Sequence, residues 1–531
     1  MKRFIAIVCH LAEQNLAFRG HNSTRHEPNN GNFLGLVELL AEFDPVMSEH
    51  VRPAEKKEIA DHCMGKTIQN ELITLIGDKI LEAITERVKQ SGYYSVIMDC
   101  TPDAAHTEQL SATLHIVTGQ INVGAAVSEH FVRFLPVLDI TGADLTDVFL
   151  THIEKLGLDI SKCRGQAYDN GSNTRSKNSR VRKRVLDINK KSTVHAMRQP
   201  QPKPSHCRRC KINSGVSLQL EYQVLMQKVQ LPDVGNALLS LIEHATQKGD
   251  SETTSAARGL EQEIMSWKFL LTAIIWYNVL HEVNHVSKLL QSSQVGIDVL
   301  QRKVENVLKF LKEYSENNLS SAQTDARDIA EESGIPMVFP TTQVRKPKHQ
   351  FQYETQSTDP SLTVALEEQY KREVFLPLVD SAITGISECF KLMESFYSLF
   401  GFIYGSEEMK NATQSHTLKD SCVSMERTLD DVDAEDLLHK VSAAVSALPA
   451  KETTGLQILS YIYSNNLVEL YPNLTIALRL MLTVPATVAS GERSFSRLKL
   501  IKTHLRTTML QEHLSALAQI SIEHEITRLL D

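Results

Sequence analysis

Three acidic residues stand at the ends of separate segments of this 531-residue chain. Asp99 ends a strand-like run that starts at Tyr93, Asp169 ends a short apolar stretch, and Glu492 opens a helical block near the C-terminus. Carboxylate oxygens are the ligands that Mg²⁺ prefers. If the three carboxylates converge, they can hold two divalent ions, and such a site cuts phosphodiester bonds.

Each acid also has an ordinary structural interpretation. An aspartate at a strand end, such as Asp99, is usually a turn residue or a helix cap. Asp169 lies in an Asn- and Gly-rich stretch that favours a turn, and Glu492 suits the positive N-terminal end of a helix. The residues taken singly leave both interpretations open, so the elements that position them decide between them.

Hydrophobic spacing predicts those elements. Apolar residues recur every four positions from Ile68 to Val88, which predicts one long amphipathic helix inside a helical N-terminal region, 1–90. Alternating and continuous apolar runs then predict three strands, a helix and a fourth strand, in that order. These segments are Tyr93–Asp99, Gln109–Thr118, Ala126–Leu135, the helix Asp144–Leu156, and the stretch that ends in Asp169. By analogy, this order matches a ribonuclease H-like core, in which the first acid ends the first strand and the second ends the fourth.

The rest of the chain is less regular in its middle and helical towards its end. Residues 175–211 carry 13 Lys and Arg and one acid, Asp187, and include a Pro-rich stretch that is not expected to fold regularly. Helical patterns cover 233–330 and 364–403, with a Gly- and Pro-containing linker at 333–362 between them. The block 453–531 is helical again.

Composition limits the class of protein. The net charge is −8 and the pI is near 6.2, so any nucleic-acid contact must use a local basic patch. Eight scattered cysteines favour a reducing compartment over secretion. The most apolar stretch, Phe269–Tyr277, is too short to cross a bilayer, so we expect an intracellular protein without a membrane partner.

Several short segments together resemble the hAT superfamily of DNA transposases, in the branch related to zinc finger MYM-type and TTF-type proteins. The resemblance covers about 1–175 and 233–531 and is most specific near the C-terminus. The segments are Met98–Asp103 with Glu108–Leu110, Gln166–Asn173, Tyr471–Asn473, Ser490–Ser496 and Lys499–Arg506.

The resemblance implies an α/β plus all-α fold, in which a large helical insertion interrupts a ribonuclease H-like core. The implied domains are the helical N-terminal region 1–90, the first part of the nuclease-like domain 91–175, a basic irregular segment 176–232, the insertion 233–450, and the C-terminal dimerisation region 453–531, which completes the core. Glu492 lies 323 residues after Asp169, which leaves room for that insertion.

By the same resemblance, Asp99, Asp169 and Glu492 are the catalytic and metal-binding triad, with Mg²⁺ or Mn²⁺ as the cofactor. The ancestral activity is metal-dependent DNA cutting and strand transfer, and the implied compartment is the nucleus. Self-association is expected through 453–531, where residues such as Leu514, Leu517 and Leu529 either bury against a second copy or fill the core of the same chain. DNA contact is expected through 175–211.

Three departures from the family pattern keep the enzyme assignment open and favour a truncated or decayed copy. The family has an N-terminal zinc-binding finger that reads DNA, and this chain is expected to start after it. Ser192–Met197 replaces a Cys-x-x-His segment, and neither Trp267 nor Trp276 lies in the family's Thr-Arg-Trp context.

Cys207 and Cys210 form a Cys-x-x-Cys with His195 nearby, but two further ligands at finger spacing are missing, so zinc is not expected there. Three readings remain: a metal-dependent transposase or nuclease, a non-catalytic dimerising protein associated with DNA or chromatin, and a protein-interaction scaffold.

Overall fold

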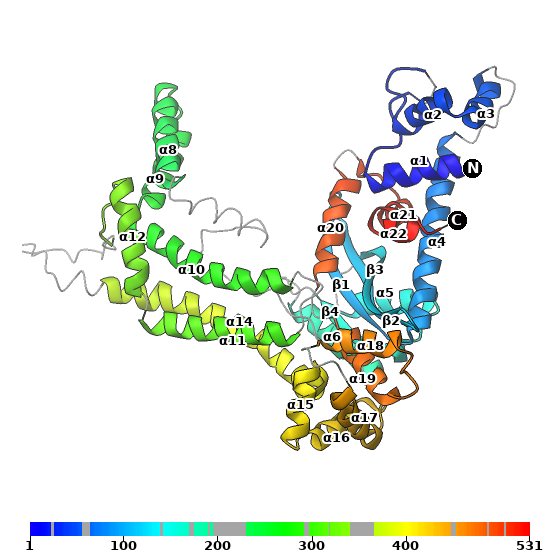
Figure 1. The fold of residues 1–531 in the computed structure, drawn as a ribbon. Coiled ribbons are helices and arrows are strands. Elements are labelled where there is room, and N and C mark those ends of the chain that lie inside the picture. Colours follow the sequence, from blue (N-terminus) through cyan, green and yellow to red (C-terminus); the bar gives the residue numbers. More distant parts are fainter. Residues whose placement is uncertain are drawn as a thin grey trace, which may run out of the picture. The chain divides into compact units, whose positions relative to one another are not determined.

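The computed structural model describes most of the chain, in two compact units (Figure 1). One unit joins Met1–Arg198 to Leu392–Asp531, and the other is Gln199–Lys391. The described residues are 1–22, 26–55, 64–137, 142–168, 175–189, 192–194, 230–290, 297–317, 319–339, 366–447, 453–485, 488–503 and 506–530.

Four helices precede the sheet of the first unit. They are α1 (Lys2–Glu13), α2 (Asn32–Phe43), α3 (Pro45–Glu55) and α4 (Lys66–Ser91). The long helix predicted from the four-residue spacing is confirmed as α4, which buries Ile76, Ile80 and Ile84. It ends at Gly92, whose φ of +73° is the left-handed conformation that glycine adopts most readily after a helix.

The sheet follows in the predicted order of strands. A meander of β1 (Tyr94–Pro102), β2 (Glu108–Gln120) and β3 (Gly124–Val137) leads through α5 (Gly142–Lys155) and the short turn η1 (Ile160–Lys162) to β4 (Cys163–Tyr168). After α6 (Arg175–Ile188) comes the two-residue strand β5 (Thr193–Val194). The spatial order is β3-β2-β1-β4-β5. The first three strands are antiparallel neighbours, and β4 runs parallel to both β1 and β5.

Helix α6 corrects one expectation. The segment 176–232 was predicted to be irregular, yet its first part is a regular helix that buries Val181 and Val185. These two residues are four apart, so they share one face of the helix. The charged residues around them masked this short apolar stripe. The Pro-rich part of the segment lies outside the described residues.

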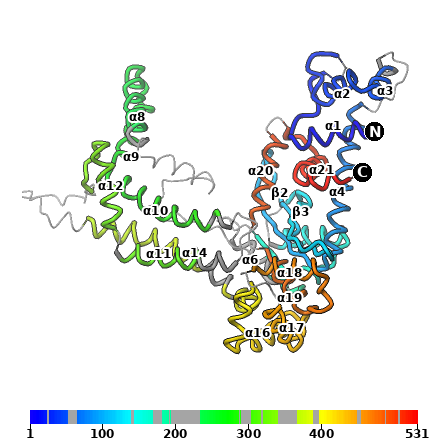
Figure 2. The backbone as a smooth tube through the Cα atoms, viewed as in Figure 1, coloured from blue at the N-terminus to red at the C-terminus, as the bar shows by residue number. Residues whose placement is uncertain are grey.

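The C-terminal part of the first unit is helical and closes the core around the sheet. Its elements are η3 (Gly401–Ile403), α15 (Ser406–Gln414), α16 (Leu418–Leu429), α17 (Ala434–Ala447), α18 (Gly455–Ser464), α19 (Pro472–Thr483), α20 (Ala489–Ile501), α21 (Gln511–Ile522) and α22 (His524–Thr527). Helix α21 contacts α4, β3 and α1, so the two ends of the chain lie side by side (Figure 2).

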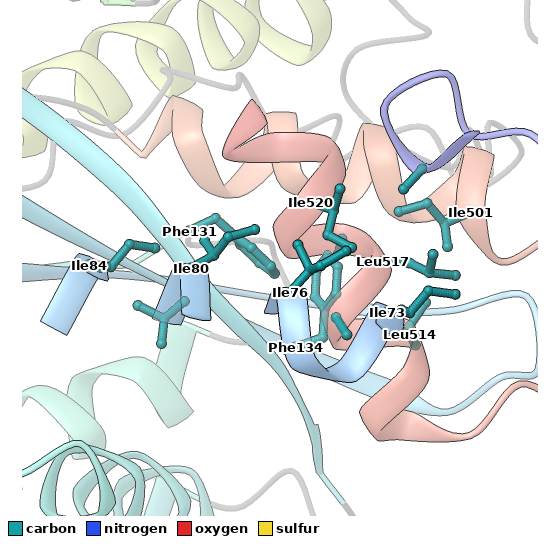
Figure 3. Packing of buried hydrophobic residues seen from close by; sticks show 14 of the residues in the cluster. Ile73, Ile76, Ile80, Ile84, Phe131, Phe134, Ile501, Leu514, Leu517 and Ile520 are labelled. Atoms are coloured by element: carbon teal, nitrogen blue, oxygen red, sulfur yellow. The ribbon is translucent and has the colours of Figure 1, made fainter. Parts of the chain in front are cut away.

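Three segments far apart in the sequence share the main core of this unit. Ile76 and Ile80 of α4, Phe131 and Phe134 of β3, and Leu517 of α21 belong to one buried cluster (Figure 3). Leu514 and Ile526 are also in this cluster, whereas Leu529 is 72% exposed. Of the leucines considered for a dimer contact, Leu514 and Leu517 are therefore core of their own chain.

The second unit is helical in its described part. It contains α8 (Gln230–Gln247), α9 (Ser251–Ile264), α10 (Trp267–Leu290), α11 (Ile297–Asn317), α12 (Leu319–Ser333) and the π-helical turn η2 (Lys371–Phe375), and its boundary falls within α14 (Leu376–Phe400). Trp267 is buried in this unit. Most of the predicted linker 333–362 lies outside the described residues. The predicted insertion runs to 450, whereas the compact first unit already includes the residues from 392 onward. The predicted domain boundaries stay predictions.

Candidate metal centre

Asp99 is a buried acid near the end of β1. Its neighbours Ile97 and Met98 are buried apolar residues, and Asp99 is only 6% exposed. Strand alternation places Ile97 and Asp99 on one face of the sheet, together with Thr113 and Ser111, their ladder partners on β2. A buried carboxylate costs free energy unless partners or cations compensate it, so its position here requires a specific environment.

Helix α20 supplies part of that environment through a glycine. A Cβ placed on Gly491 would lie 2.7 Å from the Cβ of Asp99, which is closer than real Cβ atoms approach, and 3.3 Å from its Oδ2. Only glycine therefore lets the first turn of α20 lie against the Asp99 side chain. The next residue, Glu492, sits in that same turn and is partly buried.

Two contacts fix α20 on the sheet, one at each end. Near the N-terminal end, the Ser494 hydroxyl donates to the Gly491 carbonyl at 2.6 Å and lies 2.6 Å from the Ser111 hydroxyl. Because the single Ser494 proton goes to Gly491, Ser111 is the donor of the second bond. At the C-terminal end, Lys502 donates to Asp103 at 2.7 Å.

The Lys502–Asp103 pair is buried and fully surrounded by hydrogen bonds. Oδ1 of Asp103 accepts from the backbone N–H groups of Ala105 and Thr107, and Oδ2 accepts from Gln109 as well as Lys502. Burial opposes ionisation, but Lys502 and the other donors outweigh it and hold the pKa of Asp103 below its usual value. Asp103 was part of the resembling segment Met98–Asp103, yet sequence reasoning gave it no role. Its structural role is to hold the end of α20.

A second charged group borders the start of α20. Glu129 on β3 lies 3.3 Å from Nδ1 of His115, and Arg493 donates to it at 3.0 Å. His115 also contacts the Leu482 carbonyl at 2.9 Å. Burial opposes ionisation of Glu129, but the His115 hydrogen bond and the charges of His115 and Arg493 prevail and lower the pKa of Glu129. Arg493, the residue after Glu492, is thereby tied to the sheet.

The third predicted acid, Asp169, lies outside the described residues. The structure describes β4 up to Tyr168, which pairs with Met98 in the parallel register of β1. Among the described residues, α20 therefore lies against Asp99, and its first turn carries Glu492, 393 positions later in the sequence. Among the described residues alone, no group of three or more His, Cys, Asp or Glu side chains is placed to hold a metal ion.

Two known families match this chain, one at the segment that carries Asp99 and one at the segment that carries Glu492. Residues 1–179 match the family described as ZMYM1/FAM200, RNase-like domain. Residues 439–526 match the hAT family C-terminal dimerisation region. The chain belongs to the hAT transposase-derived proteins. Asp99 and Asp169 lie in the first match and Glu492 in the second.

Two curated relatives are similar to this hAT-derived chain along its whole length. Both are named "52 kDa repressor of the inhibitor of the protein kinase", one from Homo sapiens and one from Mus musculus. The human protein is 22% identical over 609 aligned residues and the mouse protein 23% over 610. Each alignment covers all of this chain and 75% of the relative.

The surface expected to contact DNA is described only in part. Of the basic block 175–211, the structure describes α6, where Lys183 and Arg184 are exposed, and residues 192–194. Cys207, Cys210 and His195 lie outside the described residues. Within the described part of this hAT-derived chain, no helix is long and apolar enough to cross a membrane.

Proposed function

We propose that this hAT-derived chain is a self-associating protein that retains a divalent-cation centre formed by Asp99, Asp169 and Glu492. The observation that carries the proposal is the close approach of Gly491 to Asp99, since Glu492 follows Gly491 in the same helical turn. Hydrogen bonds of Ser494 and Lys502 help to hold α20 in this position.

The sheet supports a ribonuclease H-like architecture for this centre. An antiparallel meander followed by a strand parallel to the first is the arrangement expected for that fold. In it, the acids that end the first and fourth strands share one edge of the sheet. Here β4 is described up to the residue before Asp169, and that residue pairs with the one before Asp99.

The donor set fits hard divalent cations. All three proposed ligands are carboxylates, which suit Mg²⁺ and Mn²⁺. A bound metal pair would activate a water or a DNA 3′-hydroxyl and neutralise charge on the leaving oxygen. The chain's own part is to bind and to position: Asp99 and Glu492 provide ligands, Gly491 allows the close approach, and Asp103 with Lys502 holds the helix that carries Glu492.

Metal titration of the purified chain tests this centre. We expect Mn²⁺ or Mg²⁺ to bind the wild type and to bind the Asp99→Asn and Glu492→Gln variants more weakly, since each variant loses a charged oxygen ligand. Glu512→Gln is the matched control, because Glu512 is an exposed acid on α21. If the wild type and the three variants all bound each metal with the same affinity, the metal centre would be removed from the proposal.

DNA contact is proposed through the basic block that begins with α6. Such contact would use phosphates, be independent of sequence, and weaken steeply as salt is raised, because Lys and Arg release counterions from the DNA. We expect Lys183→Glu with Arg184→Glu to weaken binding of duplex DNA at low salt. Tight, salt-insensitive binding to one DNA sequence would contradict this mode of contact.

A non-catalytic interaction scaffold is the second candidate function. The relatives' names describe a repressor and no DNA-cutting enzyme, and this favours a scaffold over an active transposase. We extend this to a nuclear location as part of the same candidate. DNA cleavage assays with Mn²⁺ separate the two functions: strand cutting lost in Asp99→Asn supports the enzyme, and self-association without cutting in either protein supports the scaffold.

A further inference from the structure

Helix α10 of the second unit carries two histidines four residues apart. They are His281 and His285, in the run His-Glu-Val-Asn-His. Residues at this spacing lie on the same face of a helix, one turn apart. Their side chains converge, with Nε2 of His281 3.4 Å from Nε2 of His285.

This separation suits one shared metal ion. Zinc–imidazole bonds are about 2.0–2.1 Å long, and two such bonds at a tetrahedral angle span about 3.4 Å between the nitrogens. An ion between the two rings would therefore need little movement of either side chain. A site already formed in this way binds more tightly than one that must order its ligands first.

The surroundings hold the two rings in place and leave them accessible. Tyr277, one turn earlier on α10, stacks on His281 with the ring centroids 5.7 Å apart. The rings of His281 and His285 meet edge to face at 4.9 Å. Both histidines are exposed, whereas Val283 and Val286 on another face of the helix are buried and anchor α10 in its unit.

We propose that His281 and His285 bind one transition-metal ion of the zinc class through their Nε2 atoms. Imidazole nitrogen suits Zn²⁺, Ni²⁺ and Cu²⁺, whereas Mg²⁺ prefers oxygen, so this site differs in chemistry from the carboxylate centre. His-Glu-x-x-His on a helix is also the spacing with which zinc hydrolases bind their metal. Among the described residues, no third His, Cys, Asp or Glu joins the pair, and we assign binding by the two rings, not hydrolysis.

Calorimetric titration of the full chain with Zn²⁺, in excess Mg²⁺ to saturate the carboxylates, tests the site. We expect the wild type to bind one more Zn²⁺ than His281→Ala or His285→Ala. We also expect that ion to be released as pH falls, because protons compete for the ring nitrogens. His244→Ala, which removes an exposed histidine on α8, should bind like the wild type.

A second variant keeps the number of histidines and changes only their spacing. His285→Ala combined with Lys288→His moves the second ring to seven residues from the first, a rise of about 10 Å along the helix, too far to share an ion. We expect this variant to lose the ion while its circular dichroism stays unchanged.

A double variant, Cys207→Ser with Cys210→Ser, distinguishes zinc bound at the Cys-x-x-Cys from zinc bound by the histidines. We expect the histidine-dependent ion to remain in this variant. Equal Zn²⁺ stoichiometry and affinity in the wild type, His281→Ala and the respaced variant would overturn the proposal. That result would leave the Mg²⁺ centre untouched.

Discussion

Gly491 packs directly on Asp99, so that the backbone of α20 touches the side chain of a residue 392 positions earlier. The contact sets the distance between helix and strand, because no other residue type fits there. It also determines where the Glu492 side chain starts, since Glu492 follows in the same helical turn. The metal-centre proposal therefore depends on a residue that is not itself a ligand.

Gly491→Ala is expected to destabilise the first unit and to weaken Mn²⁺ binding. Alanine favours a helix by up to about 1 kcal/mol over glycine, but overpacking a tight contact costs about 1–3 kcal/mol. The new methyl meets Asp99 at its Cβ, which cannot move without the strand. Urea unfolding measures the stability and a Mn²⁺ titration the site.

Gly259→Ala is the matched control for this substitution. Gly259 lies in α9, and nothing stands within 4 Å of the added Cβ. We expect a gain of about 0.5–1 kcal/mol from helix propensity alone. If Gly491→Ala stabilised the protein as much as Gly259→Ala does, the close packing on Asp99 would be wrong.

Lys502→Met is expected to lower the free energy of unfolding by about 3 kcal/mol at neutral pH, because it leaves the buried Asp103 carboxylate without its cation. The pKa of Asp103 is lowered in the folded wild type, so the pair stabilises the fold above the unfolded pKa of about 3.9 and loses that contribution as pH falls below it. The difference between wild type and variant should thus shrink below about pH 4. Denaturant unfolding over a pH series measures it, and a pH-independent difference would argue against this ion pair.

His152 should make the first unit sensitive to mild acid. Burial, with added repulsion from Arg133 and Lys155, lowers the pKa of His152 to about 4. The unfolded chain takes up the proton near pH 6.5, so stability is complete above that pH and falls by about 3 kcal/mol as pH drops from about 6.5 to 4. His152→Met should unfold with a smaller dependence on pH in this window. An unchanged dependence would mean that other groups are responsible.

Substituting exposed leucines of the C-terminal region should weaken self-association directly, whereas substituting buried leucines should affect folding. Leu510 is 78% exposed and Leu500 is 53% exposed, whereas Leu517 is 5% exposed. We expect Leu510→Glu or Leu500→Glu to shift the chain towards monomer at unchanged melting temperature, since dimer interfaces bury apolar surface.

Leu517→Glu, by contrast, should unfold the first unit, because it places a charge in the core. Leu239→Glu, on an exposed face of α8, is the control. Multi-angle light scattering reads the mass, and a wild type that is monomeric at micromolar concentration would contradict self-association in this chain.

Periodic patterns predicted the elements of the first unit well. The four-residue spacing from Ile68 to Val88 gave α4, and the alternation around Leu110–Ile116 gave β2, because each element buries one face against the core. The apolar run from Tyr93 also predicted β1, although the strand continues past the expected end at Asp99 to Pro102. The resemblance then joined Glu492 to Asp99, which no local pattern could have done.

What the sequence did not indicate depends on contacts between distant segments. Serine is a common residue type on protein surfaces, but Ser111 and Ser494 are buried, and their mutual hydrogen bond makes them positioning residues. Asp103 had no predicted role, and only its contact with Lys502 reveals one. Leu517 carries the same apolar signal as Leu510, and only packing separates core from surface. Helix α6 was not predicted because Val181 and Val185, its buried apolar residues in the described part, stand among basic residues.

The first unit is built from two stretches of chain that the ribosome delivers at different times. Its sheet is complete once residue 198 has emerged, but α20 and α21, which cover it, lie beyond residue 392. Helix α21 starts at residue 511, which is 511 − 198 = 313 residues later. At about 5–20 residues per second, synthesis of this stretch takes about 15–60 s. During that interval Phe131 and Phe134 of β3 lack their partners from α21, and the nascent sheet presents an apolar face to the cell. Chaperone capture during translation is therefore expected to protect this chain, and premature stop codons after residue 198 should yield aggregates in place of a smaller folded protein.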